Sequence, residues 1–105
     1  MNIRHSTACR CFLADVEDRL AFLQYEESER QMVITHTFVP DKGRGRGIAE
    51  ALLRAAIGEA ERAQRAVVFQ CPFAAAIARR RGWANEASAA ADSAIAVMAP
   101  AAVLR

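Results

Sequence analysis

The sequence lacks the features that mark several large classes of protein. It has one tyrosine and one tryptophan, and no apolar run near the roughly 18 residues that a membrane-spanning helix needs. Residues 1–6 do not form the apolar stretch of a signal peptide. We therefore expect no membrane partner and a cytoplasmic location.

Cysteine is also scarce, with three residues in the chain. Cys9 and Cys11 would share one face of a strand but would be poorly aligned for a disulfide, which favours a reducing compartment. Their C-x-C spacing has no second pair of ligands at a convincing distance, so we expect no metal site.

The chain also lacks a large excess of charge of either sign, with a net charge of only +2. A value this small does not call for a nucleic-acid partner. The segment 42–46 has the arginine–glycine composition of some RNA contacts, but it is short and contains no aromatic residue. We therefore rank nucleic-acid binding last and expect no such partner.

The 105 residues are enough for one modest core, and they contain no repeats or linker. We expect a single domain over residues 1–105, in which the alanine-rich segment 84–105 carries little information. Hydrophobic periodicity predicts an α+β chain. The expected strands are 8–14, 19–25, 31–39 and 66–70. The expected helices are 46–65 and 73–80. Further candidates are a helix at 86–91 and a strand at 93–98.

The strand at 31–39 is the expected centre of the sheet, because both of its faces are largely apolar or β-branched. Simple alternation places Ile34, His36 and Phe38 on one face and Thr37 on the other. The helix at 46–65 then returns the chain to a buried parallel strand. We therefore expect a mostly antiparallel sheet with one parallel βαβ crossover.

Between this strand and this helix lies a glycine-rich loop, Lys42-Gly43-Arg44-Gly45-Arg46-Gly47. Glycine lets the backbone approach a ligand closely, and the helix N-terminus adds partial positive charge. This arrangement predicts a phosphate or pyrophosphate site. The loop is not a P-loop, since no Gly-Lys-Ser or Gly-Lys-Thr occurs, and its spacing does not match a dinucleotide-binding fingerprint.

The pattern Arg44-x-x-Gly47-x-Ala49 resembles the acetyl-CoA pyrophosphate signature of the GNAT superfamily of N-acetyltransferases. The segments 23–25, 36–40 and 70–73 add to the likeness, which spans residues 9 to about 81. The chain is similar to the small, single-domain GNAT-like subgroup. The resemblance implies a reduced GNAT-like fold with two main helices.

The resemblance also implies where acetyl-CoA would bind. Phe38 and Val39 would hold the pantetheine arm through their backbone. The pyrophosphate would lie on the loop and the start of the helix, that is, on Arg44, Gly45, Arg46, Gly47, Ile48 and Ala49. The thioester would lie where the strand ending near Gln70 separates from the strand at 31–39.

The acid that many GNAT enzymes use, a tyrosine four residues before a Gly-Phe pair, corresponds to Ala78 here. Cys71 is the substitute that we predict as catalytic, and the subgroup carries a cysteine there. Its thiol could donate a proton to the CoA sulfur, or it could accept the acetyl group and pass it on. Pro72 would make Cys71 the N-cap of the following helix, where the dipole favours a thiolate. The alternative is a cysteine that only packs in the core.

His36 is the second catalytic candidate, because a neutral imidazole near the thioester could take the proton of the attacking amine. A core histidine is its alternative role. His5 lies in an expected frayed terminus and receives no role. The run 79–81 is either a solvated helix end or a contact of the CoA 3′-phosphate.

These residues predict an acetyl-CoA-dependent N-acetyltransferase that acts on a small-molecule or peptide amine. The alternative function is a catalytically silent CoA-binding or protein-interaction module. The acceptor pocket of the superfamily is built from elements that this chain lacks, and a homodimer is one way to complete it.

Overall fold

The fold is built around one mixed β-sheet, and the computed structural model describes residues 2–83, 85, 86 and 96–98. Within these residues the sheet has seven strands in the order β1-β2-β3-β4-β5-β7-β6. The elements are β1 (Ile3–Ser6), β2 (Cys11–Val16), β3 (Arg19–Glu27), β4 (Gln31–Phe38), the 3₁₀ turn η1 (Asp41–Gly43), α1 (Ile48–Arg62), β5 (Ala66–Phe69), α2 (Pro72–Arg80), β6 (Asn85–Glu86) and β7 (Ala96–Met98).

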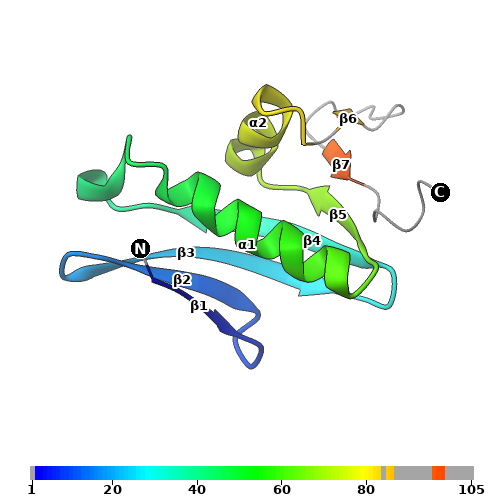
Figure 1. Ribbon diagram of the computed structural model, residues 1–105, viewed down its shortest axis with the longest axis horizontal. Helices are drawn as coiled ribbons and strands as arrows, with labels where there is room; N and C mark the ends of the chain where they lie inside the picture. The colour runs from blue at the N-terminus through cyan, green and yellow to red at the C-terminus, as the bar shows by residue number, and fades with distance from the viewer. Residues whose placement is uncertain (1, 84, 87–95, 99–105) are drawn as a thin grey trace.

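The pairing of the strands confirms the predicted α+β arrangement. β4 and β5 are parallel and are joined through α1, whereas every other described pair is antiparallel. Figure 1 shows α1 running across the sheet in front of β4, with α2 above α1 and next to β5. The β4–β5 pairing ends at Ile34 and Phe69, so β4 continues to Phe38 without β5 beside it.

The core lies between one face of the sheet and α1. On β3 the buried residues Ala21, Leu23 and Tyr25 alternate with more exposed neighbours. On α1 the buried positions recur at helical spacing, and Leu52 and Leu53 are fully enclosed. These two periodicities are what the sequence predicts for a sheet that buries one face under an amphipathic helix.

The N-terminal prediction is wrong in one respect. Residues 3–6 form β1, which pairs with β2, and the strand expected at 8–14 begins only at Cys11, because residues 7–10 form a turn. His5 is therefore not frayed: its Nε2 lies 2.6 Å from the Tyr25 hydroxyl, and its ring stacks on Phe12 at a centroid distance of 4.1 Å. Arg10, at φ 55°, turns the chain into β2.

Both ends of α2 have the capping residues that the sequence predicts. Pro72 is the first helical residue and Cys71 is the N-cap, as expected. At the other end Gly82 has φ +74°, its N–H donates to the Arg79 carbonyl at 3.0 Å, and the Trp83 N–H donates to the Ala78 carbonyl at 2.8 Å. This paired arrangement is a Schellman motif, which favours glycine at the left-handed position.

The candidate elements near the C-terminus are tested only in part. Ala96–Met98 forms β7, within the expected strand at 93–98. Glu86 lies in β6 rather than in a helix, because it pairs with Ala96. The remainder of both candidates, residues 87–95, lies outside the described residues. None of the described helices has the length and apolar character needed to cross a membrane.

Candidate functional site

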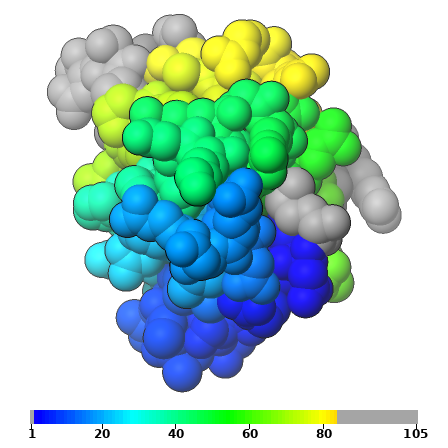
Figure 2. Space-filling model, turned by 90° about the vertical axis from the view of Figure 1, so that its left-hand side faces the viewer, coloured from blue at the N-terminus to red at the C-terminus, as the bar shows by residue number. Residues whose placement is uncertain are grey.

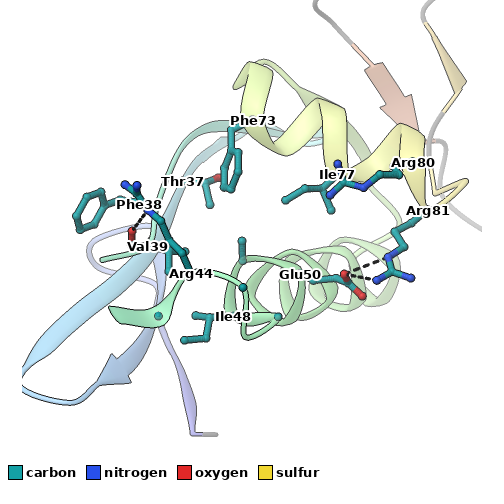
Figure 3. Close-up of a pocket in the computed structure, with 14 residues that line it drawn as sticks. Thr37, Phe38, Val39, Arg44, Ile48, Glu50, Phe73, Ile77, Arg80 and Arg81 are labelled. Atoms are coloured by element: carbon teal, nitrogen blue, oxygen red, sulfur yellow. Dashed lines mark hydrogen bonds and ion pairs between the residues drawn. The ribbon is translucent and has the colours of Figure 1, made fainter. Parts of the chain in front are cut away.

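A cavity of about 720 Å³ opens between α1 and α2 at the end of β4. Figure 2 shows this end of the molecule, where the green segment that contains the loop and α1 lies between the blue N-terminal strands and the yellow α2. One wall of the cavity is the glycine-rich loop with the first turn of α1, which we call the loop wall. The other, the strand wall, is the end of β4 with one side of α2 (Figure 3).

The loop wall depends on two glycines in left-handed conformations. Gly45 has φ +79° and Gly47 has φ +78°, a region that side chains with a Cβ rarely adopt. Apart from the two adjacent residues, no described residue has an atom within 4 Å of the position that a Cβ would take at either glycine. The backbone is therefore open to a ligand here. Gly43 differs, because a Cβ there would lie 2.8 Å from the Ile48 side chain.

The first turn of α1 offers backbone donors to this opening. Gly47 is the N-cap, no side chain caps the helix, and its first backbone hydrogen bond runs from the Ala51 N–H to the Gly47 carbonyl at 3.0 Å. A helix leaves its first N–H groups without intrahelical partners, and the macrodipole adds partial positive charge there. Gly47, Ile48, Ala49 and Glu50 all line the cavity, so this turn can hold an anion.

The two arginines of the loop are placed differently. The Arg44 Nε donates to the Val39 carbonyl at 3.3 Å, and Arg44 pairs with Asp41 at 3.1 Å, so its side chain stays at the cavity. Arg46 instead points toward Glu17, at 4.0 Å, and does not line the cavity. Only one of the two predicted cationic side chains is therefore beside the opening.

The strand wall is mostly apolar. Thr37 and Phe38 contribute from β4 and Val39 from the position directly after it, whereas α2 contributes Phe73, Ile77 and, at its end, the charged Arg80. Figure 3 shows the Phe38 ring pointing away from the cavity, and this ring lies against Phe22 at a centroid distance of 5.6 Å. The Thr37 Oγ1 is buried and has no hydrogen-bond partner among the described residues. Such an unpaired buried hydroxyl costs about 1–3 kcal/mol.

A β-bulge in β4 overturns the predicted faces of this strand. Tyr25 pairs with Ile34 but Gln24 pairs with His36, so Thr35 is an extra residue on β4. Its Oγ1 donates to the Gln24 carbonyl at 3.3 Å. An inserted residue reverses the alternation beyond it. The prediction that His36 shares a face with Ile34 is therefore wrong.

The bulge exchanges two neighbouring residues between the faces of the sheet. His36 sits opposite the exposed Gln24, on the face away from α1, and is itself exposed. Thr37 sits opposite the buried Leu23, on the face toward α1, and lines the cavity. His36 is not among the lining residues.

Cys71 lies where β4 and β5 separate. Its N–H and that of Gln70 both donate to the Ile34 carbonyl at 3.0 Å, which anchors the start of α2 to the last paired residue of β4. The Cys71 side chain is 8% exposed and belongs to the hydrophobic core, and it does not line the cavity. Ala78, at the position of the superfamily's tyrosine, is fully buried.

An ion pair joins the two walls at one edge of the cavity. The Glu50 Oε1 accepts hydrogen bonds from Arg81 Nε at 3.0 Å and from Arg81 Nη2 at 2.7 Å (Figure 3). Glu50 belongs to the first turn of α1, and Arg81 directly follows α2. Arg80 also lines the cavity, so two residues of the run at 79–81 lie at the site, although both are exposed; contact with the CoA 3′-phosphate stays a prediction.

Several lining residues are not predicted as site residues by the sequence. Thr37 and Phe73 lie in the segments 36–40 and 70–73 that carry the family resemblance, but the sequence analysis assigns them no role. Glu50 and Ile77 have ordinary residue types for their elements and line the cavity because α2 packs beside α1. For the arginine run at 79–81, a place at the site is one of two predicted alternatives. The packing of two helices depends on contacts that sequence spacing does not reveal.

The other cysteines lie far along the chain from this cavity. Cys9 is exposed in the turn after β1, and Cys11 is buried at the start of β2, so they do not share one straight strand. Burial raises the pKa of the Cys11 thiol, and the neighbouring Cys9 raises it further. Among the described residues, no group of three or more His, Cys, Asp or Glu side chains is arranged to hold a metal ion.

Comparisons with known proteins show the family and the fold of the chain. The model of a family described as GCN5-related N-acetyl-transferase matches residues 11–86, which include the loop, both helices and the central strands. The chain belongs to this family. No curated protein sequence matches it significantly.

A solved structure shows the same fold. It is a GNAT family N-acetyltransferase, YhbS, from Escherichia coli in complex with CoA, with a TM-score of 0.68 and 18% sequence identity. The match covers 85% of this chain but 57% of that one. The present chain thus corresponds to little more than half of that acetyltransferase, and the likeness establishes the reduced GNAT-like fold.

Proposed function

We propose that this protein binds acetyl-CoA in the cavity between α1 and α2 and transfers the acetyl group to an amine. The observation that carries the proposal is the division of the cavity into a wall of backbone donors and an apolar wall beside an unpaired strand end. Membership of the family and a CoA-bound structural neighbour support it.

The chemistry of the residues fits such a ligand. The amides of residues 44–49 would hold the pyrophosphate, with Arg44 as the nearby charge. The apolar strand wall, with the backbone of Phe38 and Val39, would hold the uncharged pantetheine arm. The arm would then point toward the gap where β5 leaves β4, beside Cys71.

Acetyl-CoA supplies an activated thioester, and an acyltransferase must accept the amine's proton and protonate the leaving thiolate. We assign the proton donor to Cys71, whose thiol is at the N-cap of α2. We assign the acceptor of the amine's proton to His36. Since His36 lies on the sheet face away from α1, the amine would reach the gap from that face.

An acetylation assay tests the proposal. The purified protein is incubated with acetyl-CoA and a panel of small amines, peptide N-termini and lysine peptides, and the free CoA thiol is measured. We expect release of CoA that depends on one class of amine. Saturable binding of acetyl-CoA without transfer or hydrolysis would instead support the silent CoA-binding module, which the buried Cys71 and the missing tyrosine would suit.

A further inference from the structure

The inference concerns Thr37, which lines the strand wall of the cavity. Its Oγ1 is buried and makes no hydrogen bond with any described residue. Buried hydroxyl groups nearly always have a partner, so an unpaired one in the wall of a cavity calls for an explanation. A ligand in the cavity is one source of that partner.

The backbone has to be distorted to place Thr37 there. Without the extra residue at Thr35, the alternation from Ile34 would put His36 toward α1 and turn Thr37 to the opposite face. Bulges often occur beside functional sites, where they re-aim a side chain. Here the bulge brings Thr37, instead of His36, to the face of β4 that lines the cavity.

The surroundings of Thr37 restrict what it can bind. Val39, which follows β4, and Phe73 and Ile77 of α2 line the strand wall with Thr37 and offer no side-chain hydrogen-bonding groups. The charged Arg80 of α2 also lines the cavity, and it lies beside Arg81 rather than beside Thr37 (Figure 3). Thr37 as a whole is half-buried, and a rotation about χ1 exchanges its methyl and hydroxyl groups between rotamer wells. Its hydroxyl can therefore turn toward the cavity and donate one hydrogen bond to an uncharged acceptor.

We infer that the Thr37 hydroxyl donates a hydrogen bond to a carbonyl oxygen of the pantetheine–thioester arm of the cofactor, and so fixes the arm along β4. This inference rests on the proposed function. The acceptor is either an amide carbonyl of the arm or the carbonyl of the acetyl thioester, which have the same hydrogen-bonding chemistry. Thr37 is a binding residue in this account and moves no proton.

The test uses calorimetric titration of the full chain and of Thr37→Val, which keeps the shape of the side chain but removes the donor. The ligands are acetyl-CoA, CoA and adenosine 3′,5′-bisphosphate, which lacks the arm. We expect Thr37→Val to weaken acetyl-CoA binding about three- to tenfold and to leave binding of the bisphosphate unchanged. Equal weakening for CoA identifies an amide carbonyl, and weakening for acetyl-CoA alone identifies the thioester. Thr37→Ser should restore wild-type affinity.

A second measurement separates binding from a structural role. Because valine removes an unpaired buried hydroxyl, the melting temperature of ligand-free Thr37→Val should equal or exceed that of the wild type. A lower melting temperature with unchanged acetyl-CoA affinity overturns the inference while the proposed function stands. Equal weakening for all three ligands also overturns it. A wild-type protein that binds none of the three would remove the proposed function, and this inference with it.

Discussion

The two walls of the cavity are chemically opposite. The loop wall presents backbone N–H groups, a helix N-terminus and Arg44, whereas the strand wall is mostly apolar, with Thr37 on β4 and Arg80 at the end of α2 as its polar residues. The loop wall is local, because one continuous stretch from Gly43 to Glu50 forms it. The strand wall is assembled from β4 and α2, which are far apart in the sequence. The comparison suggests a ligand with a charged end and an uncharged arm, and it suggests that the two walls can be altered separately.

The largest expected effect is at the loop wall. Gly47→Glu should weaken acetyl-CoA binding by about 100-fold or more, because a carboxylate would occupy the open space where the phosphates are expected. Calorimetry on the folded variant measures this change.

Its matched control is Gly58→Glu, which adds the same charge to α1 outside the cavity, at a glycine whose Cβ position is also open. Gly47→Ala separates the strain of a left-handed residue, about 1–2 kcal/mol, from the added charge. Equal affinity of Gly47→Glu and Gly58→Glu, both folded, would refute the assignment of the loop.

The next effect is on the rate of transfer. Cys71→Ala should slow amine acetylation about 100-fold, as expected for loss of an acid, while acetyl-CoA affinity changes little, because Cys71 does not line the cavity. Steady-state rates with saturating acetyl-CoA check this. Full activity of Cys71→Ala would assign the thiol to the core alone.

A smaller effect is expected where the two walls meet. Glu50→Gln removes a negative charge from the cavity and frees Arg81, so CoA affinity should rise about two- to fivefold at low salt. The gain should shrink in 0.5 M salt, since the charges are partly exposed and screened, with a Debye length of only about 3 Å at 1 M. An unchanged or weaker affinity at low salt would mean that the ion pair is needed to position the walls.

The smallest effect on binding is expected away from both walls. Tyr25→Phe removes the hydrogen bond to His5 and should lower the free energy of unfolding by about 0.5–1.5 kcal/mol. Denaturant unfolding measures this loss, and calorimetry should show unchanged CoA affinity. A matching loss of affinity would show that the two walls cannot be considered independently of the N-terminal strands.

The two walls also differ in how far the sequence predicts them. Gly45 and Gly47 adopt positive φ angles that other residues avoid, so the loop could be recognised from residue types alone. Pro72 and Gly82 likewise predict the ends of α2, because proline suits the first helical position and glycine the left-handed position after the last. In these places the physical constraint lies within a few consecutive residues.

The strand wall was predicted less well because its constraint is not local. The bulge at Thr35 is defined by the register between β3 and β4, and nothing in residues 31–39 alone shows that the alternation reverses. The same holds for β1, whose four residues are stabilised by pairing with β2 and by the contacts of His5. Glu50 and Arg81 meet only when α2 packs beside α1.

The central claim is that the two walls together form a site for acetyl-CoA. Calorimetric titration of the wild-type protein with acetyl-CoA, CoA and adenosine 3′,5′-bisphosphate at low and high salt tests it most directly. The account predicts saturable one-site binding of acetyl-CoA and CoA, with weaker and more salt-sensitive binding of the bisphosphate, which engages the loop wall alone. Absence of binding by acetyl-CoA and CoA at either salt concentration would contradict it.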